Sequence, residues 1–295
     1  MTLTAIIPVH GSEYESRKEN LKEIIKSARQ VELVIVADGF NQSEAASLAQ
    51  LVSDAKFCEI NLIHGVFGNP GSARNAGLET VDSEWVCFWD SDDIPNPEGF
   101  KTMIERAKKA NTSVAKGCYK VLDTRSGQIF TNNGSYISRD NPARHLVDPG
   151  IWRYAFSKSI YLNTSFPPLR MGEDQDFLVK VLISQHEVFQ SEEMVYTYRL
   201  GNETQITRSE AAFLDVGESL KYLRVLLGEY KKDQTSRTIV LTSYIKQLVT
   251  GLTRVGFRKS GIKPIPTLRF LLLTFLRGSL SKPVRIYVGE RMFKR

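Results

Sequence analysis

The chain has 295 residues, 42% of them hydrophobic, and its 39 basic and 33 acidic residues give a net charge of +6. This length allows one large domain with an appendage or two modest domains, and the hydrophobic content excludes a disordered chain. The longest apolar run, 270–276, is far shorter than the roughly 20 residues that a membrane-spanning helix needs. We therefore expect a folded protein that does not cross a membrane.

The N-terminus and the cysteines indicate a cytoplasmic protein. The opening sequence MTLTAIIPVHG lacks the basic start and the long apolar segment of a signal peptide, and it is typical of a strand. Cys58, Cys87 and Cys118 show no metal-ligand spacing and lie in apolar contexts. Such cysteines fit small buried residues that stay reduced.

Strands and helices are predicted to alternate along the first 110 residues. The expected strands are 3–9, 32–38, 57–63 and 85–89, and the expected helices are 16–30, 43–53, one from 72, and 98–110. The strand segments are almost continuously apolar, which is typical of a mostly parallel sheet covered by helices on both faces. In such sheets ligands bind beyond the carboxyl ends of the strands, so the polar turns that follow them should converge.

The rest of the chain changes character twice. A strand over 113–123 leads into a hairpin, and a loop-rich aromatic stretch follows until a helix starts at Glu173. From Arg208 to Arg295 the chain has 18 basic and 6 acidic residues, whereas the first 207 residues have 21 and 27. We place a domain boundary near 207 and expect a helical, basic C-terminal region over 208–295.

Three carboxylates crowd the segment FWDSDD directly after the strand 85–89. Asp90, Asp92 and Asp93 occupy four positions, and like charges this close raise one another's pKa unless a cation compensates. A divalent Mn²⁺ or Mg²⁺ that also binds phosphate oxygens would supply that cation. The alternative is a helix N-cap, because Asp93 lies five residues before Glu98.

Two further segments carry polar groups at predicted helix starts. GNPGSARNAGLE, 68–79, places Arg74 and Asn75 behind a Gly/Pro loop, without the spacing of a dinucleotide fingerprint or a P-loop. An ordinary capped helix is equally compatible with it. In MGEDQDF, 171–177, a carboxylate could act as a general base, or the acidic residues could merely complement the helix dipole.

Taken in order, these segments resemble the family-2 inverting glycosyltransferases of GT-A fold. The resemblance covers about residues 3–207, and its five motifs are AIIPVHG, VIVADG, GNPGSARNAGLE, FWDSDD and GEDQDF. It implies a Rossmann-like, mostly parallel sheet. It also implies transfer of a sugar from a nucleotide-diphosphate donor to a hydroxyl group, with a metal ion stabilising the departing diphosphate.

The resemblance assigns nucleotide-binding roles to residues near the strand ends. It implies that Pro8 and Val9 line the base pocket, that Asp38 contacts the nucleobase or ribose, and that Arg74 reaches the nucleotide. Many members have Asp-Asp-Gly-Ser where this chain has Ala-Asp-Gly-Phe at 37–40, so the identity of the base stays open. Uridine is the default.

The same resemblance assigns metal and catalytic roles to acidic residues. It implies that Asp90 binds ribose or metal-bound water and that Asp92 ligates the metal, with Asp90 beside it. Asp174 would be the general base, with Glu173 and Asp176 as its neighbours.

The acceptor is expected to be a glycan or a lipid-linked molecule used in the synthesis of cell-surface polysaccharides or glycoconjugates. Trp152 could stack on the face of an acceptor sugar, although aromatic core packing also explains it.

The C-terminal tail could bring the protein to a membrane surface. From Pro264 to Arg295 a short apolar segment is flanked by cations, as in helices that lie in the interface of an anionic bilayer. We expect a location in the cytoplasm, peripheral to the inner face of the membrane. A helix packed on the catalytic domain and an oligomer contact stay open as alternatives. Nucleic acid is not an expected partner, because the front half is acidic.

Three rival functions remain to be weighed. A phosphatase of the haloacid dehalogenase type also uses an Asp-x-Asp turn, but on its first strand. A sugar-phosphate nucleotidyltransferase would need a Gly-rich, Arg-containing loop, which is absent after Val9. A non-catalytic glycan-binding or scaffolding protein would have little reason to keep repelling carboxylates.

Overall fold

The chain forms two compact units in the computed structural model. Unit 1 comprises Met1–Gly134, Ile151–Phe166 and Val188–Thr204, and unit 2 comprises Ser135–Gly150, Pro167–Glu187 and Gln205–Arg295. The structure describes residues 1–55, 58–132, 141–147, 150–185, 187–201, 214–230, 232–254, 260, 262–276 and 280–292.

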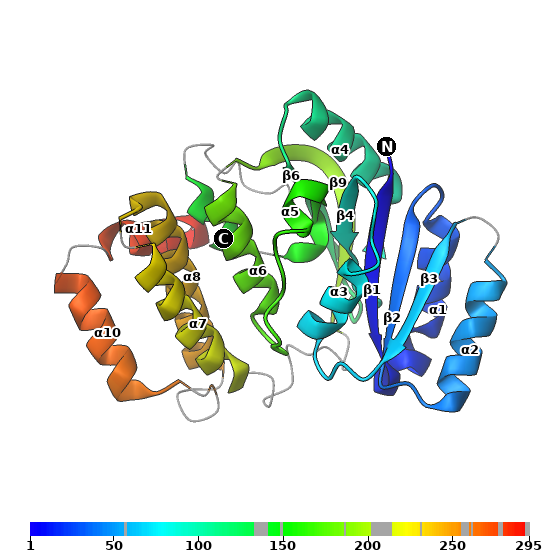
Figure 1. Ribbon diagram of the computed structural model, residues 1–295, viewed down its shortest axis with the longest axis horizontal. Coiled ribbons are helices and arrows are strands. Elements are labelled where there is room, and N and C mark those ends of the chain that lie inside the picture. Colours follow the sequence, from blue (N-terminus) through cyan, green and yellow to red (C-terminus); the bar gives the residue numbers. More distant parts are fainter. Residues whose placement is uncertain are drawn as a thin grey trace. The chain divides into compact units, whose positions relative to one another are not determined.

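Unit 1 is built on a nine-stranded sheet (Figure 1). Its strands are β1 (Leu3–His10), β2 (Glu32–Asp38), β3 (Ile60–Gly65), β4 (Trp85–Phe88), β5 (Ile94–Pro95), β6 (Val114–Asp123), β7 (Ile129–Asn132), β8 (Tyr154–Ser157) and β9 (Phe189–Leu200). The order is β3-β2-β1-β4-β8-β6-β9-β5, with β7 paired to β6. Strands β1 to β4, β6 and β9 run in one direction, and β5, β7 and β8 run against them. The predicted mostly parallel α/β sheet is confirmed.

Helices cover both faces of this sheet. They are α1 (Gly11–Ser27), α2 (Gln42–Ser53), α3 (Pro70–Leu78), α4 (Pro97–Lys109) and the short α5 (Lys158–Tyr161). Alternate side chains of a strand point to opposite faces. Ile7 of β1 therefore joins a core with α1 and α4, while Ile6 lies against α3.

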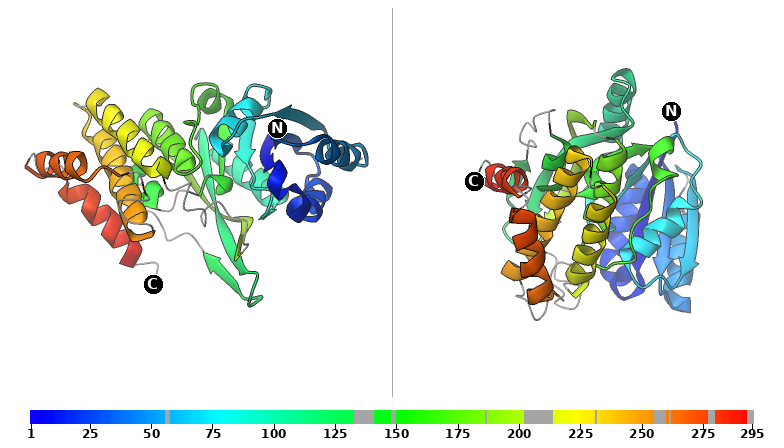
Figure 2. Two further views of the ribbon diagram at one scale, coloured as in Figure 1. Left: turned by 90° about the horizontal axis from the view of Figure 1, so that it is seen from below. Right: turned by 60° about the vertical axis from the view of Figure 1, so that its left-hand side comes forward.

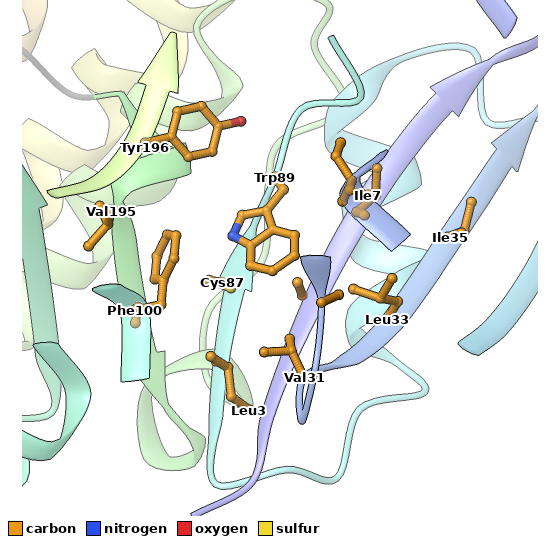
Figure 3. Packing of buried hydrophobic residues seen from close by; sticks show 14 of the residues in the cluster. Leu3, Ile7, Val31, Leu33, Ile35, Cys87, Trp89, Phe100, Val195 and Tyr196 are labelled. Atoms are coloured by element: carbon orange, nitrogen blue, oxygen red, sulfur yellow. The ribbon is translucent and has the colours of Figure 1, made fainter. Parts of the chain in front are cut away.

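The core on the α1 and α4 side is centred on Trp89 at the end of β4 (Figure 3). Its indole ring lies 5.8 Å from the ring of Phe100 in α4. Cys87 is also buried in this core, and Cys87, Cys118 and Cys58 are free thiols. Because Trp89, the residue after β4, is buried, the acidic turn that follows starts from a fixed position.

Unit 2 is helical. It contains the 3₁₀ helix η1 (Pro142–Val147), α6 (Glu173–Ser184), α7 (Asp215–Glu229), α8 (Gln234–Arg254), α10 (Pro264–Leu276) and α11 (Ser281–Met292). Helix α8 contacts η1, α6, α7 and α11 (Figure 2). The predicted helical C-terminal region is present. None of the helices in the described part of the chain is long and apolar enough to cross a bilayer.

The division into units differs from a simple cut near residue 207. The last crossing between units does fall at 204–205, but the segment Pro167–Glu187 also belongs to unit 2. The motif GEDQDF therefore lies with the C-terminal helices. The functional division into a catalytic domain over 1–207 and a C-terminal region stays a prediction.

Among the element boundaries that differ from the sequence prediction, two have a clear physical reason. Helix α1 begins at Gly11 rather than near 16, because His10 caps it by accepting the N–H of Ser12. Strand β3 extends to Gly65 rather than 63, because its pairing with β2 continues to the partners Asp38 and Gly65. Hydrophobic periodicity reveals neither the residue that caps a helix nor the register in which two strands pair.

Substituting alanine for two glycines in helices should change the stability of the protein in opposite directions. A Cβ on Gly77 of α3 would lie 2.6 Å from Cγ2 of Ile6 and 3.3 Å from Cγ2 of Val36, whereas a Cβ on Gly228 of α7 would meet nothing within 4 Å. We expect Gly77→Ala to lower the free energy of unfolding in urea by about 1–3 kcal/mol. Gly228→Ala should raise it by about 0.5–1 kcal/mol. A gain in stability for Gly77→Ala would contradict the close packing of α3 on the sheet.

Candidate active site

The turns after β1, β2 and β3 are joined by short contacts. The N–H of Gly39 donates to the carbonyl of Gly65 at 2.8 Å. A Cβ on Gly11 would lie 2.8 Å from the carbonyl oxygen of Gly39, so only glycine lets these two turns approach so closely. The expected convergence of the turns after these three strands is therefore seen in the backbone.

Asp38 fixes the loop that follows β3. Its buried carboxylate accepts the N–H of Phe67 at 2.6 Å and that of Gly68 at 3.1 Å. Among the neighbouring candidates, Val9 is buried in the core and Pro8 is half-buried. The predicted contacts of all three with a base or ribose stay predictions, and the structure adds a loop-holding role for Asp38.

Helix α3 delivers a buried cation to the end of β4. Asn69 caps the helix by accepting the N–H of Ser72 at 2.8 Å, with Pro70 in the first turn. One turn later, Nη2 of Arg74 lies 3.0 Å from Oδ1 of Asp90. The segment is thus an ordinary capped helix that also places an arginine beside the acidic turn.

The side chain of Asn75 forms hydrogen bonds with Phe166 rather than with the acidic turn. Its side-chain amide donates to the carbonyl of Phe166 at 2.9 Å and accepts the N–H of the same residue at 2.8 Å. The ring of Phe166 in turn lies 5.5 Å from the guanidinium carbon of Arg74. Asn75 therefore acts by holding the segment that packs on Arg74.

Helix α1 holds the acidic turn from the other side. Arg17 donates to the hydroxyl of Ser91 at 3.0 Å, and its Nη2 lies 3.6 Å from Oδ2 of Asp92. Asn20 donates to the carbonyls of Ser91 and Asp93, each at 2.8 Å. Arg74 thus offsets the charge of Asp90, and Arg17 is shared between Asp92 and Glu13, whose Oε2 lies 3.1 Å from its Nη2.

Asp93 has a structural role. Its buried carboxylate accepts the backbone N–H of Arg199 in β9 at 2.7 Å. Burial raises the pKa of Asp93 well above its usual range, and the charges of Asp90 and Asp92 raise it further, against the Arg199 N–H and the Tyr196 hydroxyl. Burial therefore shifts the balance of this carboxyl towards its neutral form. The N-cap of α4 is Asn96, so the alternative of Asp93 as a helix cap is wrong.

Asp90 and Asp92 fit a hard divalent cation. Their carboxylates are partly exposed, at 29% and 14%, and Oδ2 of Asp90 takes no hydrogen bond from the described residues. Within the same residues no group of three or more His, Cys, Asp or Glu side chains could hold a metal ion. Mg²⁺ is commonly bound by one or two carboxylates, with water and substrate phosphates completing its shell. A metal held here would therefore rely on a phosphate ligand.

The predicted base lies in unit 2, in the first turn of α6. Gly172 precedes the helix with φ of 90°, a conformation that favours glycine. Asp174 is half-buried, whereas Glu173 is buried. All three acidic residues of this turn lie at the positive end of the helix dipole, so the dipole explanation stays compatible with a catalytic one.

Asp176 belongs to the interior of unit 2. Its Oδ2 accepts the hydroxyl of Ser219 in α7 at 2.7 Å, and its Oδ1 accepts the side-chain amide of Gln247 in α8 at 2.9 Å. Burial raises the pKa of Asp176 well above its usual range, although both hydrogen bonds oppose the rise. The side chain therefore supports the start of α6.

The C-terminal helices hold this start at further points. Arg170 is paired with Asp215 of α7, with Nη2 to Oδ1 at 3.0 Å. Gln175 donates to the hydroxyl of Ser243 in α8 at 2.8 Å and accepts from Lys246 at 3.0 Å. Helices α7 and α8 thus position the segment that carries Asp174.

Trp152 is a member of an aromatic cluster in unit 1. Its ring stacks on Tyr196 at 4.6 Å and on Tyr198 at 5.7 Å, and meets the edge of Tyr119 at 4.8 Å. The ring is thus engaged in aromatic packing. Its predicted role as an acceptor contact stays a prediction.

Sequence reasoning missed the residues that support the acidic turn. Besides Arg17 and Asn20, they include Tyr196, whose hydroxyl accepts the N–H of Asp90 at 2.8 Å, and Arg199, which donates to the side chain of Asn20 at 2.5 Å. These residues lie inside a regular helix and a regular strand. No local pattern sets them apart.

A model of the family described as glycosyl transferase family 2 matches residues 4–166, more than half of the chain. The chain belongs to this family. The match contains every residue to which the motifs assigned a nucleotide contact, from Pro8 to Asp90. The phosphatase alternative, which rested on the acidic turn alone, loses its support.

Among similar proteins of this family, the succinoglycan biosynthesis protein ExoO of Rhizobium meliloti is 33% identical over 100 residues, covering 33% of this chain and 28% of ExoO. The chain spans less than a third of the length of the first curated relatives it matches.

Two solved structures share the fold. Residues 1–349 of Staphylococcus aureus TarS, in complex with UDP-GlcNAc, match with a TM-score of 0.66 at 16% identity, over 87% of this chain and 75% of that chain. The mannosyltransferase PcManGT of Pyrobaculum calidifontis, in complex with GDP-Man and Mn²⁺, matches with a TM-score of 0.55 at 12% identity, over 99% and 84%. The predicted GT-A fold is confirmed.

The raised pKa of Asp176 predicts a pH-dependent effect of Asp176→Asn. An acid with a raised folded-state pKa loses stability as the pH rises from about 4, its unfolded pKa, towards the folded value. Asparagine does not titrate, and it can still accept from Gln247 and donate to Ser219. We expect the free energy of unfolding of Asp176→Asn, relative to that of wild type, to rise with pH above about 4, by at most about 1.4 kcal/mol per pH unit.

The matched control is Glu218→Gln, on the exposed side of α7. Urea unfolding from pH 4 to pH 8 measures both variants against wild type. A flat difference between Asp176→Asn and wild type over this range would contradict the raised pKa of Asp176.

Proposed function

We propose that the protein transfers a sugar from a nucleoside-diphosphate donor, with uridine as the default base, to a hydroxyl group of a glycan or lipid-linked acceptor, with inversion at the anomeric carbon. The observation that carries this proposal is the built environment of the acidic turn. Asp90 and Asp92 follow a buried strand, and each has an arginine within ion-pair distance. Because the chain belongs to a family of glycosyltransferases, we infer that this turn binds the metal ion and the diphosphate of a nucleotide-sugar donor.

The donor would be held by residues of unit 1. Arg74 is buried beside Asp90 and can attract phosphate or orient the carboxylate towards a ribose hydroxyl. Asp90 and Asp92 would hold Mn²⁺ or Mg²⁺, which supplies positive charge to the departing diphosphate. The fold of PcManGT, solved with Mn²⁺, supports a divalent metal without identifying the ion.

Asp174 would act on the acceptor. As a general base, its carboxylate takes the proton of the acceptor hydroxyl while that oxygen forms a bond to the anomeric carbon. The bond from the anomeric carbon to the diphosphate breaks in the same displacement, and the bonding electrons leave with the diphosphate. One displacement of this kind inverts the configuration. Glu173, the neighbouring carboxylate in the same turn, is proposed as a catalytic residue beside Asp174.

The acceptor and the pathway are proposed at the level of class. ExoO is named for succinoglycan biosynthesis, and TarS is a poly(ribitol-phosphate) β-N-acetylglucosaminyltransferase. Both names support a cell-surface polysaccharide or glycoconjugate as the product. The cytoplasmic side of the membrane stays the proposed place of action.

Donor binding is testable before the acceptor is known. Calorimetric titration with UDP, GDP and dTDP, each with and without Mn²⁺, should give metal-dependent binding of one nucleotide. Asp92→Ala should weaken that binding about 100-fold or more, because one of two protein ligands of the metal is lost. The control is Asp54→Ala at an exposed helix end, which should bind as wild type does.

The same titration can also overturn the proposal. A folded wild-type protein that binds none of the three nucleotides under either metal condition would overturn the glycosyltransferase mechanism. A scaffold or glycan-binding function would then explain the fold better.

The catalytic step should separate from donor binding in Asp174→Asn. We expect UDP release from the matching UDP-sugar, with water or an acceptor as the nucleophile, to slow by about 10²–10⁴-fold, because the general base is removed. The dissociation constant of UDP should stay within about twofold of wild type, because the donor residues lie elsewhere in the chain. Glu218→Gln is the control in the same unit. Full turnover by Asp174→Asn would assign the base to another residue.

A further inference from the structure

Helix α10 buries two threonines and leaves three large apolar side chains exposed. Ile265, Leu268 and Leu272 are 80%, 61% and 59% exposed, whereas Thr267 and Thr274 are only 2% and 6% exposed. The three apolar residues are spaced by three and four positions, so they form one row along the helix. A helix that packs for stability alone would bury this row.

The orientation of α10 is fixed by contacts on its inner side. Arg224 of α7 donates to the hydroxyl of Thr267 at 3.0 Å, and its guanidinium carbon lies 5.2 Å from the ring of Phe270. The ring of Phe270 also lies 4.7 Å from that of Tyr244 in α8. These contacts hold α10, the orange helix of Figure 1, in unit 2 with its apolar row pointing away from α7 and α8.

The stretch of sequence that contains α10 carries charge of one sign. Between residues 234 and 289 the sequence contains ten Lys and Arg residues and no Asp or Glu. Lys263 and Arg269 are exposed in and beside α10, and Lys282 and Arg285 are exposed in α11. Such a surface attracts an anionic partner, and it would repel a second copy of itself.

We propose that the row Ile265, Leu268 and Leu272 inserts into the interface of an anionic lipid bilayer, with the surrounding cations on the headgroups. Exposed apolar residues in a segment rich in Lys and Arg are the features of a helix that lies in the membrane plane. At 13 residues α10 is roughly 20 Å long, too short to cross the hydrocarbon layer. This surface is independent of the donor site, so it holds whether or not the proposed sugar transfer is correct.

The test is co-sedimentation of the full chain with vesicles. Vesicles of phosphatidylcholine with roughly 30 mol% phosphatidylglycerol should bind the protein, and vesicles of phosphatidylcholine alone should not. Binding should fall in about 0.5 M salt, which screens the charges. Leu268→Ser with Leu272→Ser should lower the partition coefficient about tenfold or more, because the inserted apolar surface is lost.

The matched control is Leu162→Ser with Val225→Ser. Both residues are 61% exposed, close to the 61% and 59% of the tested pair, and Leu162 lies at the end of α5 and Val225 in α7. This variant should bind vesicles as wild type does. Equal losses in both double variants, or no binding of wild type to anionic vesicles, would overturn the proposal.

Two further readouts keep the result independent of folding. Leu268→Trp should shift its fluorescence emission to shorter wavelength on adding anionic vesicles, and a lipid brominated in its acyl chains should quench it. Light scattering without lipid tests the competing occupant. A dimer that the Leu268 and Leu272 substitutions abolish, together with absent vesicle binding, would assign the row to self-association instead.

Discussion

The crowding of three carboxylates after β4 is the constraint on which the active end of unit 1 depends. The repulsion among them is reduced in a different way at each residue. Arg74 pairs with Asp90, Arg17 lies near Asp92, and burial favours the protonated form of Asp93. The turn therefore keeps its shape without a metal ion, while one oxygen of Asp90 still takes no hydrogen bond from the described residues. A cation that brings its own phosphate ligand can bind there without rebuilding the turn.

A similar arrangement positions the predicted base in unit 2. The buried carboxyl of Asp176 takes one hydrogen bond from Ser219 and one from Gln247, so α7 and α8 fix the first turn of α6. The C-terminal helices, expected from their charge to form a basic region of their own, thus support the segment that carries the predicted base. The apolar row of α10 takes no part in this framework and stays exposed, and it is the surface that we propose for membrane binding.

Local sequence patterns predicted those parts of the protein whose causes are local. Apolar strands gave the parallel sheet, and the acidic turn and the start of α6 followed from residue types at fixed spacing. The supports of these features were beyond such patterns, because Asn20 reaches residues more than 70 positions away and Arg199 reaches Asn20 across 179. The outward row of α10 was hidden for a related reason, since its orientation is set by Arg224 in another helix.

A crystal structure of the protein with UDP and Mn²⁺, with the metal located by its anomalous scattering, would test the proposed metal site most directly. We expect one metal peak within about 2.5 Å of a carboxylate oxygen of Asp92, next to the diphosphate, with Arg74 still paired to Asp90. UDP bound away from the end of β4, or bound there without a metal peak at Asp92, would contradict the claim that the acidic turn is built for a metal–nucleotide complex.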